Sequence, residues 1–260
     1  MELPIYQVDA FASSIFRGNP AAICPLTEWL PDETLQAIAV ENNLSETAYF
    51  VRQGERFHLR WFTPGSEVDL CGHATLASAF VLFHFLNEPG KTIYFDTKSG
   101  ELTVTREGEL LTLDFPSRPP AAFEAGPELL AAIGGQPIEV CKARDVVLVY
   151  KTEAEILALK PDMGALSKLD HFGFIVTAPG TTCDFVSRFF APAKGVPEDP
   201  VTGSAHTTLI PYWAKRLGKS ELLARQVSKR TGELYCKLEG DRVKIAGYAA
   251  PFLRGTITLP

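Results

Sequence analysis

The sequence predicts an α+β protein with two pseudo-symmetric domains, each a curved, mostly antiparallel sheet or barrel around a central helix. Three observations lead to this fold class. The chain has 260 residues, which suits one large or two small domains. Similar segments recur in the same order about 130 residues apart, which indicates an internal repeat. Each half also holds one apolar helical segment after strand-like runs.

The internal repeat is visible at three places in the sequence. Its offset drifts by only four residues along the match, which small loop insertions explain, and a chance match would not stay in order. The matching segments are Arg60-Trp61-Phe62-Thr63-Pro64 with Arg188-Phe189-Phe190-Ala191-Pro192 at an offset of 128, Gly72-His73-Ala74 with Gly203-Ser204-Ala205 at 131, and Ser99-Gly100-Glu101-Leu102 with Thr231-Gly232-Glu233-Leu234 at 132.

A proline-rich stretch between the repeats marks the predicted domain boundary. Neither a helix nor a central strand continues easily through Pro116-Ser117-Arg118-Pro119-Pro120. We therefore predict an N-terminal domain over residues 1–116 and a C-terminal domain over residues 121–260. The active site is expected in the cleft between these two domains.

Strand-like runs of apolar and aromatic residues open each half. The expected strands are 6–11, 48–51 and 57–62 in the first half, and 146–150, 172–177 and 185–190 in the second. A hairpin follows in each half, because Glu107-Gly108 and Glu239-Gly240-Asp241 suit a chain reversal. The expected hairpin strands are 100–105 with 110–115, and 232–238 with 242–245.

One helix in each half is expected at the centre of its domain. The helix over residues 73–87 is apolar on nearly every face, so protein should surround it. Its counterpart covers 204–217, with a kink at Pro211, and a short helix over 31–42 lies outside the first sheet. A doubly wound sheet could also fit this alternation, but the sequence has no glycine-rich phosphate loop to support it.

Each central helix begins at a glycine, Gly72 or Gly203, which would let a ligand approach the backbone closely. Helix N-termini carry unpaired N–H groups and a partial positive charge, so they attract anions. The duplicated placement favours a small carboxylate ligand held by both helix starts. The alternative is that the two glycines simply begin helices.

Acid–base candidates cluster near these helix starts. Asp69 and His73 lie by the first helix, and Asp199 lies before the second, where its side chain could face the cleft or cap the turn. Glu46 stands between a helix and an apolar strand, a partly buried place that suits a proton shuttle. Its spacing alone favours an exposed glutamate at a strand edge.

The five cysteines are an odd number without a CxxC pair, which indicates reduced thiols in an intracellular, cytoplasmic protein. Cys71 could act as a nucleophile beside His73. Together with Cys183 and His206 these two could also be zinc ligands, although their spacing fits no closed zinc motif, and we predict no metal. No phosphate or dinucleotide motif occurs, so we predict no organic cofactor.

Charge and hydropathy limit the possible partners. The net charge is −6 and the basic residues are scattered, so we predict no nucleic-acid partner. The most apolar stretch, residues 74–86, is too short and too polar to span a bilayer, so no membrane partner is expected.

The chain resembles the phenazine-biosynthesis PhzF-like isomerase family, which is itself related in fold to diaminopimelate epimerase and proline racemase. The resemblance covers almost the whole sequence. The motifs that carry it are Val8-Asp9-Ala10-Phe11, Gly18-Asn19-Pro20-Ala21-Ala22, Asn43-Leu44-Ser45-Glu46-Thr47-Ala48, Arg60-Trp61-Phe62-Thr63-Pro64, Cys71-Gly72-His73-Ala74-Thr75, and Glu198-Asp199-Pro200-Val201-Thr202-Gly203-Ser204-Ala205-His206.

The resemblance implies a diaminopimelate epimerase-like fold and a cofactor-independent isomerase, commonly a homodimer. It implies catalytic roles for Glu46 as acid/base and for His73 and Asp199. Substrate binding would fall to Gly72, Gly203 and Ser204, with Cys71 and Thr202 in the pocket wall. The related epimerases use two cysteines, and Thr202 stands where the second would be, which favours one base over two thiols. A non-catalytic acid-binding protein and a Cys71 thiol enzyme remain the alternatives, and the sequence does not name the substrate.

Overall fold

Two units make up the fold in this computed structural model, which describes residues 1–259. Unit 1 comprises Met1–Phe115 and the chain from Ile245 onward, and unit 2 comprises Pro116–Lys244. The first boundary falls at the predicted proline-rich stretch. The second boundary differs from the prediction, which placed the whole of 121–260 in one domain. Pro260 lies outside the described residues.

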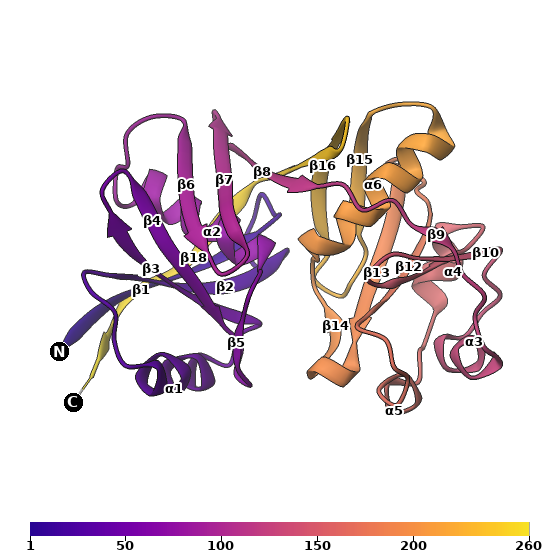
Figure 1. The fold of residues 1–260 in the computed structure, drawn as a ribbon, viewed down its shortest axis with the longest axis horizontal. Coiled ribbons are helices and arrows are strands. Elements are labelled where there is room, and N and C mark those ends of the chain that lie inside the picture. Colours follow the sequence, from indigo (N-terminus) through magenta and orange to yellow (C-terminus); the bar gives the residue numbers. More distant parts are fainter. Residues whose placement is uncertain (260) are drawn as a thin grey trace. The chain divides into compact units, whose positions relative to one another are not determined.

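Unit 1 is a mostly antiparallel sheet around helix α2 (Figure 1). Its elements are β1 (Glu2–Ala10), β2 (Asn19–Leu26), α1 (Asp32–Asn42), β3 (Glu46–Gln53), β4 (Arg56–Phe62), β5 (Glu67–Val68), α2 (Gly72–His84), β6 (Thr92–Thr97), β7 (Gly100–Glu107), β8 (Leu110–Pro116, whose last residue enters unit 2) and β18 (Ala249–Thr258).

Unit 2 follows the same plan around helix α6, drawn in orange in Figure 1. Its elements are β9 (Ala121–Ala122), α3 (Pro127–Ile133), β10 (Glu139–Lys142), β11 (Val146–Val149), α4 (Glu153–Ala158), α5 (Met163–Leu166), β12 (Phe174–Pro179), β13 (Phe185–Ala191), the 3-10 turn η1 (Pro192–Lys194), β14 (Val196–Asp199), α6 (Gly203–Leu217), β15 (Glu221–Gln226), β16 (Gly232–Glu239) and β17 (Arg242–Gly247, which continues into unit 1).

The strand pairings repeat from one unit to the other, which confirms the fold class predicted from the duplication. In unit 1, β2 and β3 are parallel, β3 and β4 antiparallel, and β4 and β6 parallel. In unit 2 the corresponding pairs β11/β12, β12/β13 and β13/β15 have the same directions. A doubly wound sheet is mostly parallel, whereas most strand pairs here are antiparallel, which rules it out.

The central helices are buried as the sequence predicts. Every residue of α2 from Gly72 to Phe83 is buried, and α6 buries ten of its residues although Pro211 lies inside it. Their small residues let the surrounding strands approach, while α1 packs with only part of its surface inward. No helix among residues 1–259 is long and apolar enough to cross a membrane.

The last strand explains why the second boundary differs from the prediction. β18 follows β17 in the chain but pairs antiparallel along the whole of β1. In the same way β9, which follows β8, pairs with β10 of unit 2 at two positions. The last strand of the second repeat therefore belongs to unit 1, and sequence order alone assigns it to the wrong domain.

The same bidentate ion pair occurs at matching positions of the two repeats, shortly before each central helix begins. Arg60 on β4 donates to both carboxylate oxygens of Glu67 on β5, at 2.7 and 3.0 Å. Arg188 on β13 donates to both oxygens of Glu198 on β14, at 2.7 and 3.1 Å. The arginine of the repeated motif thus ties a short hairpin whose end leads into the helix.

Candidate active site

Unit 1 gathers three of the predicted site residues at the start of α2. Cys71 is the N-cap residue, and Gly72 and His73 begin the helix. Glu46 is the first residue of β3. The carboxylate Oε2 of Glu46 lies 3.0 Å from Nε2 of His73, with the two side chains 18% and 5% exposed. A partly buried carboxylate therefore faces a buried imidazole, which is an arrangement suited to proton transfer.

Asn19, the first residue of β2, contacts the other nitrogen of the His73 ring. Its amide Nδ2 lies 3.2 Å from Nδ1 of His73. In the neutral form of the ring, an Asn19 amide that donates to Nδ1 leaves the ring proton on Nε2, the nitrogen that lies nearest Glu46. Burial by itself would lower the pKa of His73, but the neighbouring Cys71 and the Glu46 carboxylate outweigh it and raise the pKa well above the ordinary value. The pair is thus held ready to share a proton.

Cys71 is close to His73 but is a poor candidate for a thiolate. Its Sγ lies 3.5 Å from Nδ1 of His73. Burial, followed by the charge of Glu46, raises the pKa of the Cys71 thiol to about 11 although His73 acts in the opposite direction. The thiol is therefore protonated at neutral pH, and a nucleophile needs the thiolate.

A metal ion could be held by the same group of side chains. One ligand atom each from Glu46, Cys71 and His73 lies within 4.8 Å of the others, the one such group of three found in the described part of the chain. Carboxylate, thiolate and imidazole would suit a zinc-like ion. The zinc set considered from the sequence also needed Cys183 and His206, and neither residue belongs to this group. Asp69 is exposed and lies outside it as well.

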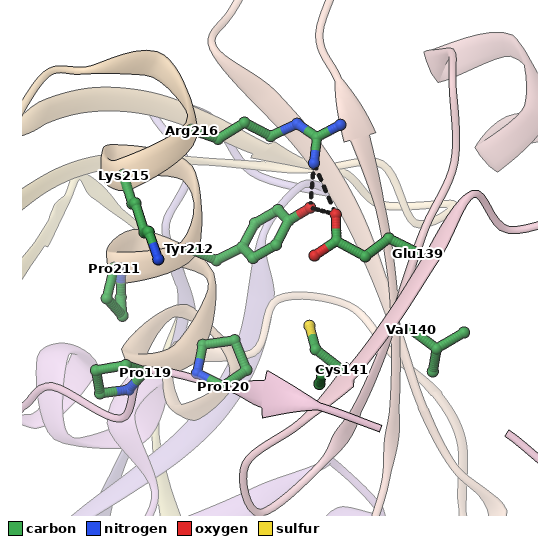
Figure 2. Close-up of a pocket in the computed structure, with 10 residues that line it drawn as sticks. Pro119, Pro120, Glu139, Val140, Cys141, Pro211, Tyr212, Lys215 and Arg216 are labelled. Atoms are coloured by element: carbon green, nitrogen blue, oxygen red, sulfur yellow. Dashed lines mark hydrogen bonds and ion pairs between the residues drawn. The ribbon is translucent and has the colours of Figure 1, made fainter. Parts of the chain in front are cut away.

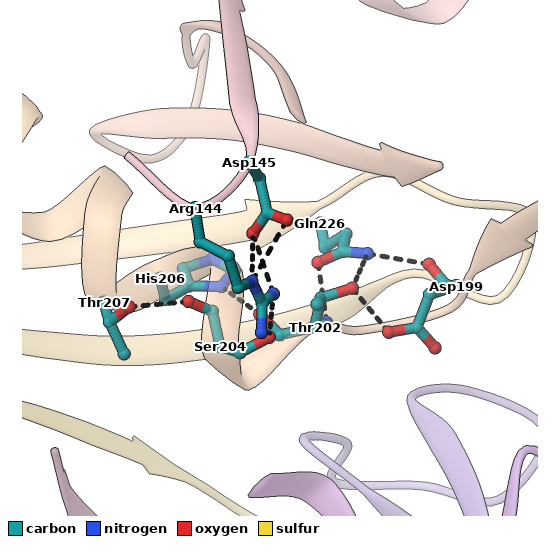
Figure 3. Close-up of polar contacts among 8 residues, drawn as sticks. All are labelled: Arg144, Asp145, Asp199, Thr202, Ser204, His206, Thr207 and Gln226. Carbon is teal, nitrogen blue, oxygen red and sulfur yellow. Dashed lines mark hydrogen bonds and ion pairs between the residues drawn. The ribbon is translucent and has the colours of Figure 1, made fainter. Parts of the chain in front are cut away.

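Unit 2 holds Asp199 in a hydrogen-bonded loop before α6 (Figure 3). The Thr202 hydroxyl donates to Oδ2 of Asp199 at 2.5 Å. Gln226 on β15 accepts from the backbone N–H of Thr202 at 2.8 Å and donates to the backbone carbonyl of Asp199 at 2.7 Å. These hydrogen bonds fix the position of Asp199 before the helix.

Ser204 is the second residue of α6, and its hydroxyl meets an arginine that the sequence does not single out. Nη2 of Arg144 donates to Oγ of Ser204 at 3.1 Å. Arg144 is held in turn by Asp145, whose two oxygens accept three hydrogen bonds from it at 2.8 to 3.2 Å. Figure 3 shows this chain from Asp145 through Arg144 to Ser204.

His206 is a buried structural residue of the second helix start. Its Nδ1 lies 2.8 Å from the carbonyl oxygen of Thr202, and burial lowers its pKa to about 4. In unit 1 the matching residue, Thr75, makes the matching bond to the carbonyl of Cys71 at 2.6 Å. His206 therefore remains neutral near pH 7 and closes the first turn of α6, as Thr75 does for α2.

Glu46 has no acidic counterpart in unit 2. The strand registers pair Thr47 with Phe62 in unit 1, and Phe174 with Phe190 in unit 2. Because the two phenylalanines at the strand ends are matching residues of the repeat, the glutamate before Thr47 corresponds to Gly173. The two units are alike in fold but differ in the groups that they present.

Sequence reasoning missed four polar residues of these clusters: Asn19, Arg144, Asp145 and Gln226. Asn19 lies in a motif that carries the family resemblance, so it could have been found there. The others lie on strands and turns far in sequence from the helix start that they contact. Their role depends on strand pairing, which a local pattern does not show.

A further hollow of about 500 Å³ lies in unit 2 between β10 and α6 (Figure 2). Glu139 accepts from Tyr212 and from Arg216, each at 2.8 Å, and Arg216 also donates to the tyrosine oxygen at 2.7 Å. None of the predicted site residues lines this hollow. Its carboxylate is already paired, so it does not offer a second acid–base centre.

Comparisons with known proteins agree with this fold. The family model for phenazine biosynthesis-like proteins matches residues 8–255. A Pseudomonas aeruginosa protein named an uncharacterized isomerase is 54% identical over 260 residues, covering 100% of both chains. A crystal structure of a PhzF-family phenazine biosynthesis protein from Enterococcus faecalis has a TM-score of 0.98, 49% identity and full coverage of both chains.

The fold extends to more distant enzymes. A probable proline racemase from Agrobacterium radiobacter shares a TM-score of 0.65 over 99% of this chain and 93% of that chain, at 9% identity, so this likeness concerns the fold alone. The duplicated architecture is therefore the fold of this racemase. The class of protein is an isomerase, as relatives matched over the whole chain are named. The chain belongs to the phenazine biosynthesis-like (PhzC/PhzF) family.

Proposed function

We propose that the protein is a cofactor-independent isomerase that moves a proton at a carbon atom of a small carboxylate or amino-acid-like substrate. Glu46 is the acid/base. The observation that carries this proposal is its partly buried carboxylate, 3.0 Å from the buried His73 imidazole. A base so placed is shielded from bulk water and has a partner that can stabilise either protonation state.

The reaction proceeds in two balanced steps. The carboxylate of Glu46 takes the proton as the C–H bond breaks, and the electron pair is delocalised into the neighbouring carboxyl or unsaturated group. The proton then returns from Glu46 to the other face of that carbon or to another carbon. His73, which Asn19 contacts, lies beside the Glu46 carboxylate and holds it in place for the transfer.

The helix starts supply the groups that bind the substrate in this proposal. The backbone N–H groups at Gly72 and Gly203 attract the carboxylate and stabilise the negative charge that develops during proton removal. Ser204 adds a hydroxyl group, and Cys71 and Thr202 complete the wall. Asp199, held by Thr202, positions the substrate and assists the transfer. The proposal retains the expectation that both units act on one substrate.

The assay is hydrogen exchange at carbon in heavy water, followed by proton NMR with candidate amino acids and unsaturated carboxylic acids. The wild type should exchange a carbon-bound proton of its substrate for deuterium. Glu46→Gln keeps the shape of the side chain and should slow exchange by about a hundredfold or more while substrate binding persists. Glu41→Gln, an exposed change on α1, is the matched control and should leave exchange unchanged.

Two outcomes would replace the proposal with another. Exchange within a few-fold of wild type in Glu46→Gln would remove Glu46 from the mechanism. Carboxylate binding without exchange by the wild type would leave a non-catalytic binding protein.

We also propose that the protein is a homodimer, as the family resemblance implies, and that it is cytoplasmic, as its odd number of widely spaced cysteines indicates. Light scattering on the eluting protein should then give about twice the 28.5 kDa mass of one chain.

A further inference from the structure

Arg144 is an arginine whose position is fixed from three sides. Nε and Nη2 donate to the Asp145 carboxylate, which is only 2% exposed, and Nη2 also donates to Ser204. The guanidinium lies 4.2 Å from the centre of the Phe172 ring. A side chain held so firmly has little conformational entropy left to lose when a ligand binds.

One edge of the guanidinium remains available. The Nη1 atom of Arg144 makes no hydrogen bond to any residue in the described range 1–259, and the side chain is 31% exposed. Since the Ser204 oxygen accepts from Nη2, its own proton is left to donate to a ligand. The Lys194 ammonium lies 5.6 Å from the same Phe172 ring and adds positive charge. These donors together suit a planar anion.

The internal repeat gives the central helix of unit 2 a side-chain contact comparable with the one that His73 makes in unit 1. Ser204 and His73 are each the second residue of their central helix, and each meets a side chain from the start of the strand pair beside it. That side chain is Asn19 in unit 1 and Arg144 in unit 2, at 3.2 and 3.1 Å. Where unit 1 orients an acid–base group, unit 2 therefore presents a fixed cation.

The Asp145 carboxylate, which holds Arg144, also crowds Gly173, the position in unit 2 that matches Glu46. A Cβ atom at Gly173, the counterpart of Glu46, would lie 3.1 Å from Oδ1 of Asp145 and 2.5 Å from the Phe189 ring. No side chain fits there without a shift of its neighbours. Both oxygens of Asp145 accept hydrogen bonds from Arg144. Unit 2 therefore presents a cation that can bind an anion, where unit 1 presents a carboxylate base.

We propose that Arg144 is the specificity-determining residue that recognises the carboxylate of the substrate, with Ser204 and the first N–H groups of α6. It selects a carboxylate over the neutral amide of the same shape. Asp145 is a positioning residue that acts through Arg144. This inference rests on the proposed function, because it names the group that recognises the substrate of that reaction.

The test is calorimetric titration with benzoate and its neutral isostere benzamide. The wild type should bind benzoate measurably. Arg144→Met should weaken benzoate binding at least tenfold and leave benzamide binding unchanged, because a charge-assisted contact is lost. Arg144→Lys keeps the charge without the planar fork and should restore part of the affinity. Arg216→Met, which removes an exposed arginine paired with Glu139, is the matched control and should bind benzoate within twofold of wild type.

Benzoate binding to Arg144→Met within twofold of wild type would overturn the inference, as would no measurable benzoate binding by the wild type. Circular dichroism checks that each variant is folded. In the exchange assay Arg144→Met should raise KM at least tenfold with kcat nearly unchanged, whereas Glu46→Gln lowers kcat.

The two proposals can fail separately. If no substrate exchanges hydrogen but benzoate binding still depends on Arg144, the proposed function fails and the anion site stands. If exchange depends on Glu46 but benzoate binding is indifferent to Arg144, the function stands and the anion site fails.

Discussion

Removing the Glu67 carboxylate should destabilise unit 1 by an amount that depends on pH. The hydrogen bonds from Arg60 lower the pKa of Glu67 from 4.5 to about 2, with Lys98 helping and burial opposing. The difference of about 2.5 pKa units corresponds to at most about 3.4 kcal/mol at about 1.36 kcal/mol per unit. We expect about 1–3 kcal/mol for Glu67→Gln at pH 7, because glutamine still accepts one hydrogen bond from Arg60.

The sign of the pH dependence follows from proton linkage. Because the folded state holds Glu67 at a lower pKa, the unfolded chain binds more protons between pH 4.5 and 2. The stabilisation is therefore fully present above pH 4.5 and is lost as the pH falls toward 2. The difference in unfolding free energy between wild type and Glu67→Gln should shrink over this range.

Urea unfolding of both proteins at pH 7 and at several values down to about pH 3 would measure this difference. Glu101→Gln is the matched control, because Glu101 pairs with Arg56 but is 46% exposed. Its effect should stay within about 0.5 kcal/mol at every pH, as is usual for exposed ion pairs. A pH-independent loss in Glu67→Gln would refute the reasoning, since it would reflect packing and not the ion pair.

Three further predictions concern the site. Cys71→Ala should keep at least a tenth of the activity, because burial keeps the thiol protonated; loss of activity in a folded variant would establish the thiol mechanism instead. Gly72→Val and Gly203→Val should each weaken binding of a small carboxylic acid strongly in calorimetry, and an effect at only one of them would show that a single helix start binds the anion. Dialysis against a chelator should leave hydrogen exchange intact, whereas loss restored by zinc would assign a metal to Glu46, Cys71 and His73.

The sequence predicts the local elements of this fold well because each has its own periodic pattern. The central helices and both hairpins lie where apolar periodicity and turn residues indicate them. The first central helix ends at His84 and not at Asn87 as predicted, because Asn87 adopts a left-handed backbone with φ of 54°. The amino-acid pattern beyond His84 remains apolar, so this stop is not apparent from hydrophobicity.

Long-range pairing limits what the sequence predicts. β18 pairs with β1, which lies at the other end of the sequence, and the residues of β18 alone do not indicate which strand it pairs with. The same limit applies to the site: Glu46, His73 and Asp199 were proposed from motifs, whereas Arg144 and Gln226 meet the helix start only through strand register.

The two repeats differ in the side chains that could transfer protons, and this difference limits the possible mechanisms. An epimerase with two thiols needs matching nucleophiles, and the residue that matches Cys71 in the repeat is Thr202. The hydroxyl of Thr202 donates to Asp199, so it is already engaged in holding a carboxylate. The position that matches Glu46 is a glycine crowded by Asp145 and Phe189. The repeat therefore offers no position for a second base, which supports the proposed mechanism in which the proton returns from Glu46 itself.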